Sequence, residues 1–203
     1  MTITIYKPRL FAAAARFTST DYARRYLHGV SIEAAHAGGA YIVSTDGHRL
    51  FVGYDPDADM GGAESALIQP ATRKFPAGRY KIDGKLVLGD DQAQWYRDPD
   101  GDKPDEIEIS PELRDETFPD WTRLIPRDLR SEGVPAQFNA THLWEFAEAH
   151  RLLAGHKSAF CAPVRHDGHN AALVDLGPDA FGILMPIRAD ARTSPPFDIN
   201  HKA

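Results

Sequence analysis

The chain has 203 residues, of which 42% are hydrophobic, and this is enough for one elaborated domain or two small ones. No apolar run approaches the roughly 20 residues of a membrane span, and no basic stretch leads into an apolar one as in a secretory signal. The net charge of −6 argues against a protein that coats nucleic acid, and the single Cys161 excludes an intrachain disulfide. We therefore expect a cytoplasmic protein.

The N-terminal stretch is predicted to form a strand followed by a helix. Residues 2–6 alternate β-branched and polar side chains, and Pro8 suits the first turn of a helix. Across residues 9–17, the larger apolar side chains recur at helical spacing on one side. This helix is short and rich in alanine, so it needs a sheet to pack against.

Residues 26–54 are the part of the chain around which the rest is organised. Runs of alternating apolar residues are separated by Gly38-Gly39 and by Asp46-Gly47, a dipeptide typical of type I′ hairpin turns. This pattern predicts a three-stranded antiparallel meander with one buried face.

The middle of the chain is rich in turn signals. A strand over 66–69 is predicted to stop at Pro70. Asp83-Gly84 and Asp100-Gly101 each separate two apolar runs, which predicts two hairpins. Residues 118–126 combine large apolar side chains with proline, as a packed extended connector does.

The last part repeats the opening plan. A strand over 134–138 is followed by a helix over 143–154, with Asn139 or Thr141 as N-cap and Gly155 as the end. Strands are predicted at 158–164, 172–176 and 181–187. We therefore expect a single domain over 1–190, with units 1–57 and 134–190, a β-rich insertion or connector over 58–133, and a loose tail over 191–203.

Two short sequence motifs resemble those of a known family. Tyr-Leu-x-Gly at 26–29, followed by Thr-Asp-Gly-His-Arg-Leu at 45–50, resembles the bacterial DNA polymerase III β-subunit, or sliding clamp. Further collinear matches are Ala66–Pro70 with Arg73-Lys74, Phe118–Trp121 with Leu124–Pro126, Phe138-Asn139, and Leu184–Arg188.

The resemblance implies an α+β protein with the DNA-clamp fold: two strand–helix–three-strand units, with antiparallel sheets, two helices on one face and a β-hairpin insertion near 75–115. A family protomer has three domains with two helices each, whereas only two such helices are predicted here. The chain therefore looks like a shortened relative, bacterial or phage-encoded.

The resemblance also implies a peptide-binding groove. In the family, polymerase and repair proteins insert a short hydrophobic peptide between two domains. The matching positions are Leu27, Thr45, Gly47, His48, Arg49, Leu50, Pro70, Met185, Pro186, Ile187 and Arg188. Apolar side chains and an adaptable methionine suit such capture. Periodicity alone gives the other interpretation, in which Leu27, Leu50, Met185 and Ile187 are core residues of strands.

Clamps also bind duplex DNA without base readout, through basic side chains on their helices. The matching candidates are Lys7, Arg9 and Arg16 on the first helix. The second helix carries Glu145 and Glu148 instead, which does not suit a DNA-facing surface.

Catalysis has little support in the sequence. Asp46-Gly-His48 and Asp167-Gly-His169 could hold a metal only if they converged, and Asp-Gly is also the ordinary hairpin dipeptide. We expect no enzyme, no metal and no cofactor. The expected function is that of a clamp-like processivity or accessory protein that binds clamp-binding peptides, with a homo-oligomeric ring on double-stranded DNA as one possibility. The alternatives are a monomeric peptide-binding module that competes with the replicative clamp, and a metal-dependent hydrolase.

Overall fold

The computed structural model describes residues 2–70, 82–89, 92–98, 100–101, 103–110, 116–126, 136–155, 163–166 and 170–187. The predicted tail over 191–203, the strand residues 158–162 with Cys161, the Asp167–His169 turn and Arg188 lie outside these ranges.

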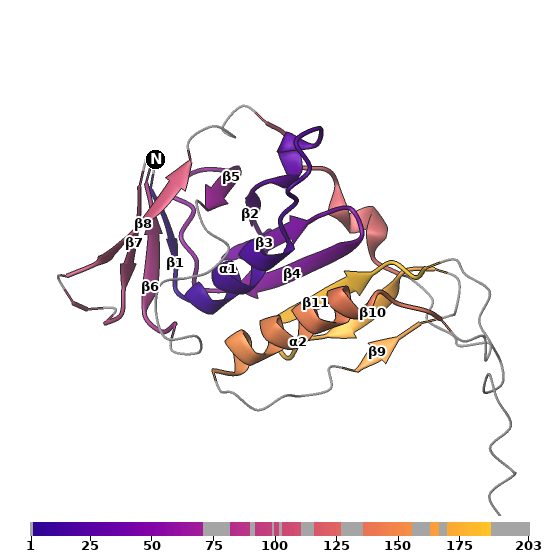
Figure 1. The fold of residues 1–203 in the computed structure, drawn as a ribbon. Helices are drawn as coiled ribbons and strands as arrows, with labels where there is room; N and C mark the ends of the chain where they lie inside the picture. The colour runs from indigo at the N-terminus through magenta and orange to yellow at the C-terminus, as the bar shows by residue number, and fades with distance from the viewer. Residues whose placement is uncertain are drawn as a thin grey trace, which may run out of the picture.

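Within the described residues, eleven strands form one antiparallel sheet in the order β1-β6-β7-β8-β5-β2-β3-β4-β11-β10-β9 (Figure 1). The first unit supplies β1 (Ile3–Ile5), β2 (Val30–Ala34), β3 (Ala40–Thr45) and β4 (Arg49–Asp55). The middle supplies β5 (Ser65–Pro70), β6 (Lys85–Leu88), β7 (Gln92–Tyr96) and β8 (Asp105–Ser110). The last unit supplies β9 (Val164–Arg165), β10 (Ala172–Asp175) and β11 (Ala180–Leu184).

Helices α1 (Pro8–Ala14) and α2 (Ala140–Ala154) pack against each other on one face of this sheet, as predicted (Figure 1). Pro8 occupies the first turn of α1, and a 3₁₀ turn, η1 (Ala15–Phe17), continues it. The side chain of Asn139 caps α2 by accepting from the Thr141 N–H at 2.9 Å. Gly155 ends α2 with φ +73°, a backbone conformation that favours glycine.

The main core lies between the two helices and the sheet. The rings of Phe17 and Phe146 are 4.8 Å apart, so α1's continuation and α2 meet here, and Phe51 of β4 packs beneath Phe17 at 5.6 Å. A Cβ on Gly182 would lie 2.0 Å from Phe146 Cε1. The absence of a side chain at Gly182 therefore lets α2 approach β11 closely.

The middle strands join the main sheet, and β6 and β7 pair as consecutive antiparallel strands in the region predicted to hold a hairpin insertion. β6 pairs with β1 and β8 pairs with β5, while β7 lies between β6 and β8. The pairing of 95–96 with the strand around 107 was predicted. β6 pairs with β1 on one side and with β7 on the other, so the strand predicted before Asp83-Gly84 has no free edge of β6 to pair with, and its residues 80–81 lie outside the described ranges. The backbone carbonyl of Asp83 accepts from Trp95 Nε1 at 2.7 Å.

The meander has two buried faces where only one was predicted. On the face away from the helices, Val43, Leu50, Val52 and Ile183 form a second cluster, which we call the outer cluster. The connector covers it with Trp121, which begins the 3₁₀ turn η4 (Trp121–Leu124). Alternation along the strands showed which side chains share a face, but it did not show that a distant connector lies on the second face.

No helix in the described ranges is long and apolar enough to cross a bilayer.

Candidate peptide-binding site

The two segments that the sequence resemblance brings together are neighbours in the structure. β4 pairs with β11 in antiparallel register, with Arg49 opposite Leu184. Beyond that pair, the Met185 N–H donates to the His48 carbonyl at 2.9 Å. The turn before β4 and the segment after β11 are therefore held side by side by backbone hydrogen bonds.

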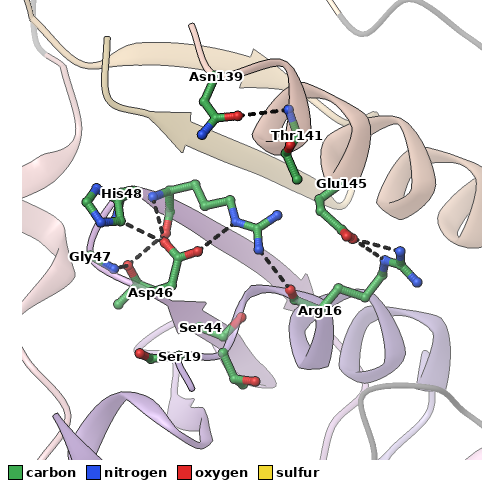
Figure 2. A network of polar contacts seen from close by, with 12 residues as sticks. Arg16, Ser19, Ser44, Asp46, Gly47, His48, Asn139, Thr141 and Glu145 are labelled. Carbon is green, nitrogen blue, oxygen red and sulfur yellow. Dashed lines mark hydrogen bonds and ion pairs between the residues drawn. The ribbon is translucent and has the colours of Figure 1, made fainter. Parts of the chain in front are cut away.

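The turn between β3 and β4 is built around the Asp46 carboxylate (Figure 2). Asp46 Oδ1 accepts from the N–H groups of His48 and Arg49 at 3.0 and 3.1 Å. Gly47 has φ +90°, but no residue other than glycine has a positive φ among the described residues, so this is not the type I′ turn predicted. The carboxylate cap takes the place of a second left-handed residue.

Arg49 links this turn to the helices. Its Nε donates to Asp46 Oδ2 at 2.9 Å, its Nη2 donates to the carbonyl of Arg16 at 3.3 Å, and its guanidinium lies 4.8 Å from the centre of the Phe17 ring. Burial raises the pKa of Asp46, but the hydrogen bonds from Arg49 and the His48 N–H outweigh it and hold that pKa below its usual value. Arg49 is only 8% exposed, and its Nη1 has no acceptor among the described residues.

His142 also belongs to this site, although sequence reasoning gave it no role. It lies in the first turn of α2, and its ring stacks on that of His48 with centroids 5.8 Å apart. Burial lowers the pKa of His142, and the neighbouring charge of Arg49 lowers it further. The start of α2 is thus a third wall beside the turn and the β11 segment.

The predicted site residues divide into exposed and buried groups. Met185 and Ile187 are 44% and 49% exposed, and Gly47 and His48 are exposed as well. Pro186 is half-buried.

The other side chains are buried. Leu27 is 4% exposed and Leu50 is 1% exposed, and Leu50 belongs to the outer cluster. The core interpretation therefore holds for these two leucines, and they do not line an open slot. Thr45 is buried too, because its hydroxyl donates to the Arg49 carbonyl at 2.7 Å and accepts from the Gly47 N–H at 3.0 Å. Thr45 shapes the turn instead of facing solvent.

Pro70 was wrongly assigned to the site. It is buried at the end of β5, and β2, β3 and β4 lie between β5 and β11. Its register partner is Ile109 of β8. The motif around Pro70 matched the family in letters, but sheet order puts it several strands away. Ile183, two residues before Met185, is buried in the outer cluster, and alternation along β11 could have indicated this.

The three cations proposed to face DNA are all engaged within the chain. Lys7 Nζ is 2.7 Å from Asp179 Oδ1, and Arg16 is 2.7 Å from Glu145 Oε2 (Figure 2). Arg9 pairs with Asp83 and donates to the Leu153 carbonyl at the end of α2. These side chains tie the first unit to α2, to the β10–β11 turn and to the middle strands, so they do not project freely as predicted.

A cavity of about 480 Å³ opens on the outer face at the other end of β4 and β11. Its lining includes Tyr41, Val52, Tyr54, Ile125, Leu173 and Phe181. None of the predicted site residues lines this cavity. Among the described residues, no three potential metal ligands lie close enough together to hold an ion, and the Asp46 carboxylate accepts a hydrogen bond from Arg49.

No protein-family model matches the chain, and no curated protein matches it either. Solved structures do. The DNA polymerase sliding clamp of Bacillus subtilis is 14% identical, covers 94% of this chain and 65% of its own, and superposes with a TM-score of 0.61. The sliding clamp of Bartonella birtlesii, bound to griselimycin, is 17% identical with coverages of 93% and 66% and the same TM-score of 0.61. The Caulobacter crescentus clamp is 17% identical, covers 93% and 65%, and has a TM-score of 0.57.

The protein thus has an α+β architecture of antiparallel sheet with two helices on one face, and this is the fold of bacterial DNA polymerase III β sliding clamps. The chain spans about 65% of the length of the clamps that it matches.

Proposed function

We propose that this chain is a clamp-type accessory protein that binds short hydrophobic peptides of replication or repair proteins at the surface formed by His48, Met185 and Ile187. The observation that carries the proposal is the β4–β11 pairing, which sets the exposed Met185 beside the Asp46–His48 turn. The exposed Ile187 follows two residues later, where its N–H donates to the Gln137 carbonyl at 2.7 Å. The clamp fold supports the same role, since the Bartonella clamp binds griselimycin.

The chemistry of the surface suits peptide capture. Met185 adapts its shape to different apolar anchors, and Ile187 adds a branched apolar wall two residues further on. The proposed role is binding, and it needs neither catalysis nor a cofactor.

The test is a fluorescence-anisotropy titration of the purified chain with a fluorescein-labelled clamp-binding peptide from a bacterial replicative polymerase. We expect saturable binding by the wild type, and binding at least about tenfold weaker in the double variant Met185→Ala/His48→Ala. Tyr6→Ala is the matched control. Tyr6 is 46% exposed but lies at the far end of β4, where its N–H donates to Asp55. Absence of saturable binding by the wild type, or equal loss in the control, would contradict the proposal.

A second candidate is a monomeric module that captures such peptides, or competes for them, without encircling DNA. The ion pairs of Lys7, Arg9 and Arg16 favour it, because binding to backbone phosphates depends on cations free to replace counterions. The mass in solution separates the candidates. A ring of family size would need about six copies joined at sheet edges. A monomer that is not retained on closed circular plasmid DNA would support the module, and a ring released only when the circle is cut would support the clamp.

A further inference from the structure

The start of α2 meets the candidate site through a pair of stacked histidines. The ring centroids of His48 and His142 are 5.8 Å apart and the ring planes are inclined by 28°. His48 belongs to the turn of the first unit, and His142 belongs to the first turn of α2, almost 100 residues later. This stack is therefore a contact between the two units at the edge of the peptide-binding surface.

Burial and the charge of Arg49 disfavour a proton on His142. The groups that face His142 are Asp46, His48 and Arg49 from the turn and Glu145 from its own helix. Both acids are already paired, Asp46 with Arg49 and Glu145 with Arg16. The cation that acts on His142, Arg49, is held in place by three contacts. A second positive charge at this point, on His142, would be poorly compensated.

We propose that His48 and His142 form a proton-sensitive clasp, which holds the Thr45–Leu50 turn against the start of α2 at neutral pH and opens on acidification. Histidine is the side chain whose charge changes between about pH 5 and 8. A proton on His142 adds a positive charge beside Arg49, so the stacked arrangement loses population.

The direction of the effect follows from linkage. The pKa of His142 is lowered in the folded chain, first by burial and then by Arg49. A lowered pKa means that the stacked form binds protons less readily than an open form does. Its stability is therefore complete above roughly pH 6.5 and is lost as the pH falls through the lowered pKa.

Hydrogen exchange at the Met185 amide tests the clasp, because this N–H donates to the carbonyl of His48. We expect its protection factor in the wild type to fall between pH 7.5 and 5.5, relative to the amide of Ile42 within β3. His142→Phe keeps a flat ring that cannot be protonated, and it should abolish this fall. His150→Phe removes another histidine of α2 and should keep it.

An equal fall in His142→Phe, or no fall in the wild type, would overturn the clasp. The exchange measurement needs no peptide, so it stands apart from the proposed function. If the labelled peptide binds, its affinity should fall in parallel with the Met185 protection in the wild type and should not fall in His142→Phe. A peptide that binds at neither pH would overturn the proposed function, while exchange would still decide the clasp.

Discussion

Substitution of Gly182 tests how closely α2 packs against the sheet. It lies in β11 opposite Phe51 of β4, and a Cβ there would be 2.0 Å from Phe146 Cε1. Phe146 is 1% exposed and is wedged against Phe17, so its ring has little room to move. Substitution Gly182→Ala must therefore displace the ring or the strand.

Two opposing effects set the change in the free energy of unfolding caused by Gly182→Ala. Forcing a methyl group into a filled core costs about 1–3 kcal/mol. Replacing glycine restricts the unfolded chain, which returns about 0.4–1 kcal/mol. The clash outweighs the entropy term, and we expect Gly182→Ala to lower the free energy of unfolding by about 1–2 kcal/mol. In a Phe146→Leu background, where the ring is absent, the same change should be close to neutral.

Urea unfolding followed by far-ultraviolet circular dichroism measures all four members of this cycle, with m-values as a check that the compared states are alike. Gly53→Ala is the matched comparison on the neighbouring strand. A Cβ there would lie 2.8 Å from the flexible end of Leu10 and 3.2 Å from Phe51 Cε1, both farther than the 2.0 Å contact with Phe146, so its cost should be smaller. An equal loss of stability from Gly182→Ala in both backgrounds would refute the packing argument.

Three further predictions concern the ends of α2 and the turn. Asn139→Ala should cost about 1 kcal/mol of stability by removing the N-cap, while Asn139→Asp should retain it; a denaturant melt that shows no difference would contradict the cap. Gly155→Ala should cost about 1–2 kcal/mol, because its φ is +73° and Arg9 crowds the position; an unchanged urea midpoint would speak against this. Burial raises the pKa of Asp46, but the hydrogen bonds from Arg49 and His48 outweigh burial and hold that pKa low in the folded chain. The ionised Asp46 therefore stabilises the fold above about pH 4, and this stabilisation is lost as the pH falls through the lowered pKa. Asp46→Asn should therefore lower stability at pH 7 and flatten the acid limb of the stability–pH curve, and an acid limb as steep as that of the wild type would be evidence against the assignment.

Local patterns in the sequence predicted most of the secondary structure. Alternation and glycine pairs located β2, β3 and β4, and Asn139 and Gly155 marked the two ends of α2, although the helix begins three residues earlier than expected. Each of these signals acts over a few residues, so one sequence is enough to detect it.

What the sequence did not reveal depends on contacts between distant residues. Trp121 covers the outer cluster and hydrogen-bonds Glu33, which makes Leu50 a buried residue instead of a groove wall. The acidic partners of Lys7 and Arg16 come from the β10–β11 turn and from α2. The spacing of residues along the chain does not reveal such pairings. It also does not reveal the order of strands in the sheet, which places Pro70 away from β11.

The β4–β11 ladder has a consequence for the timing of synthesis. The proposed surface combines residues 45–50 with residues 184–187, which are joined only when the two strands pair. A ribosome that has made the first three quarters of the chain has produced the turn but not the strand that completes it. A partner peptide would therefore have nothing to hold until β11 has emerged and closed this long loop, a slow kind of contact to form. On this proposal, peptide binding would be confined to chains whose translation has passed β11.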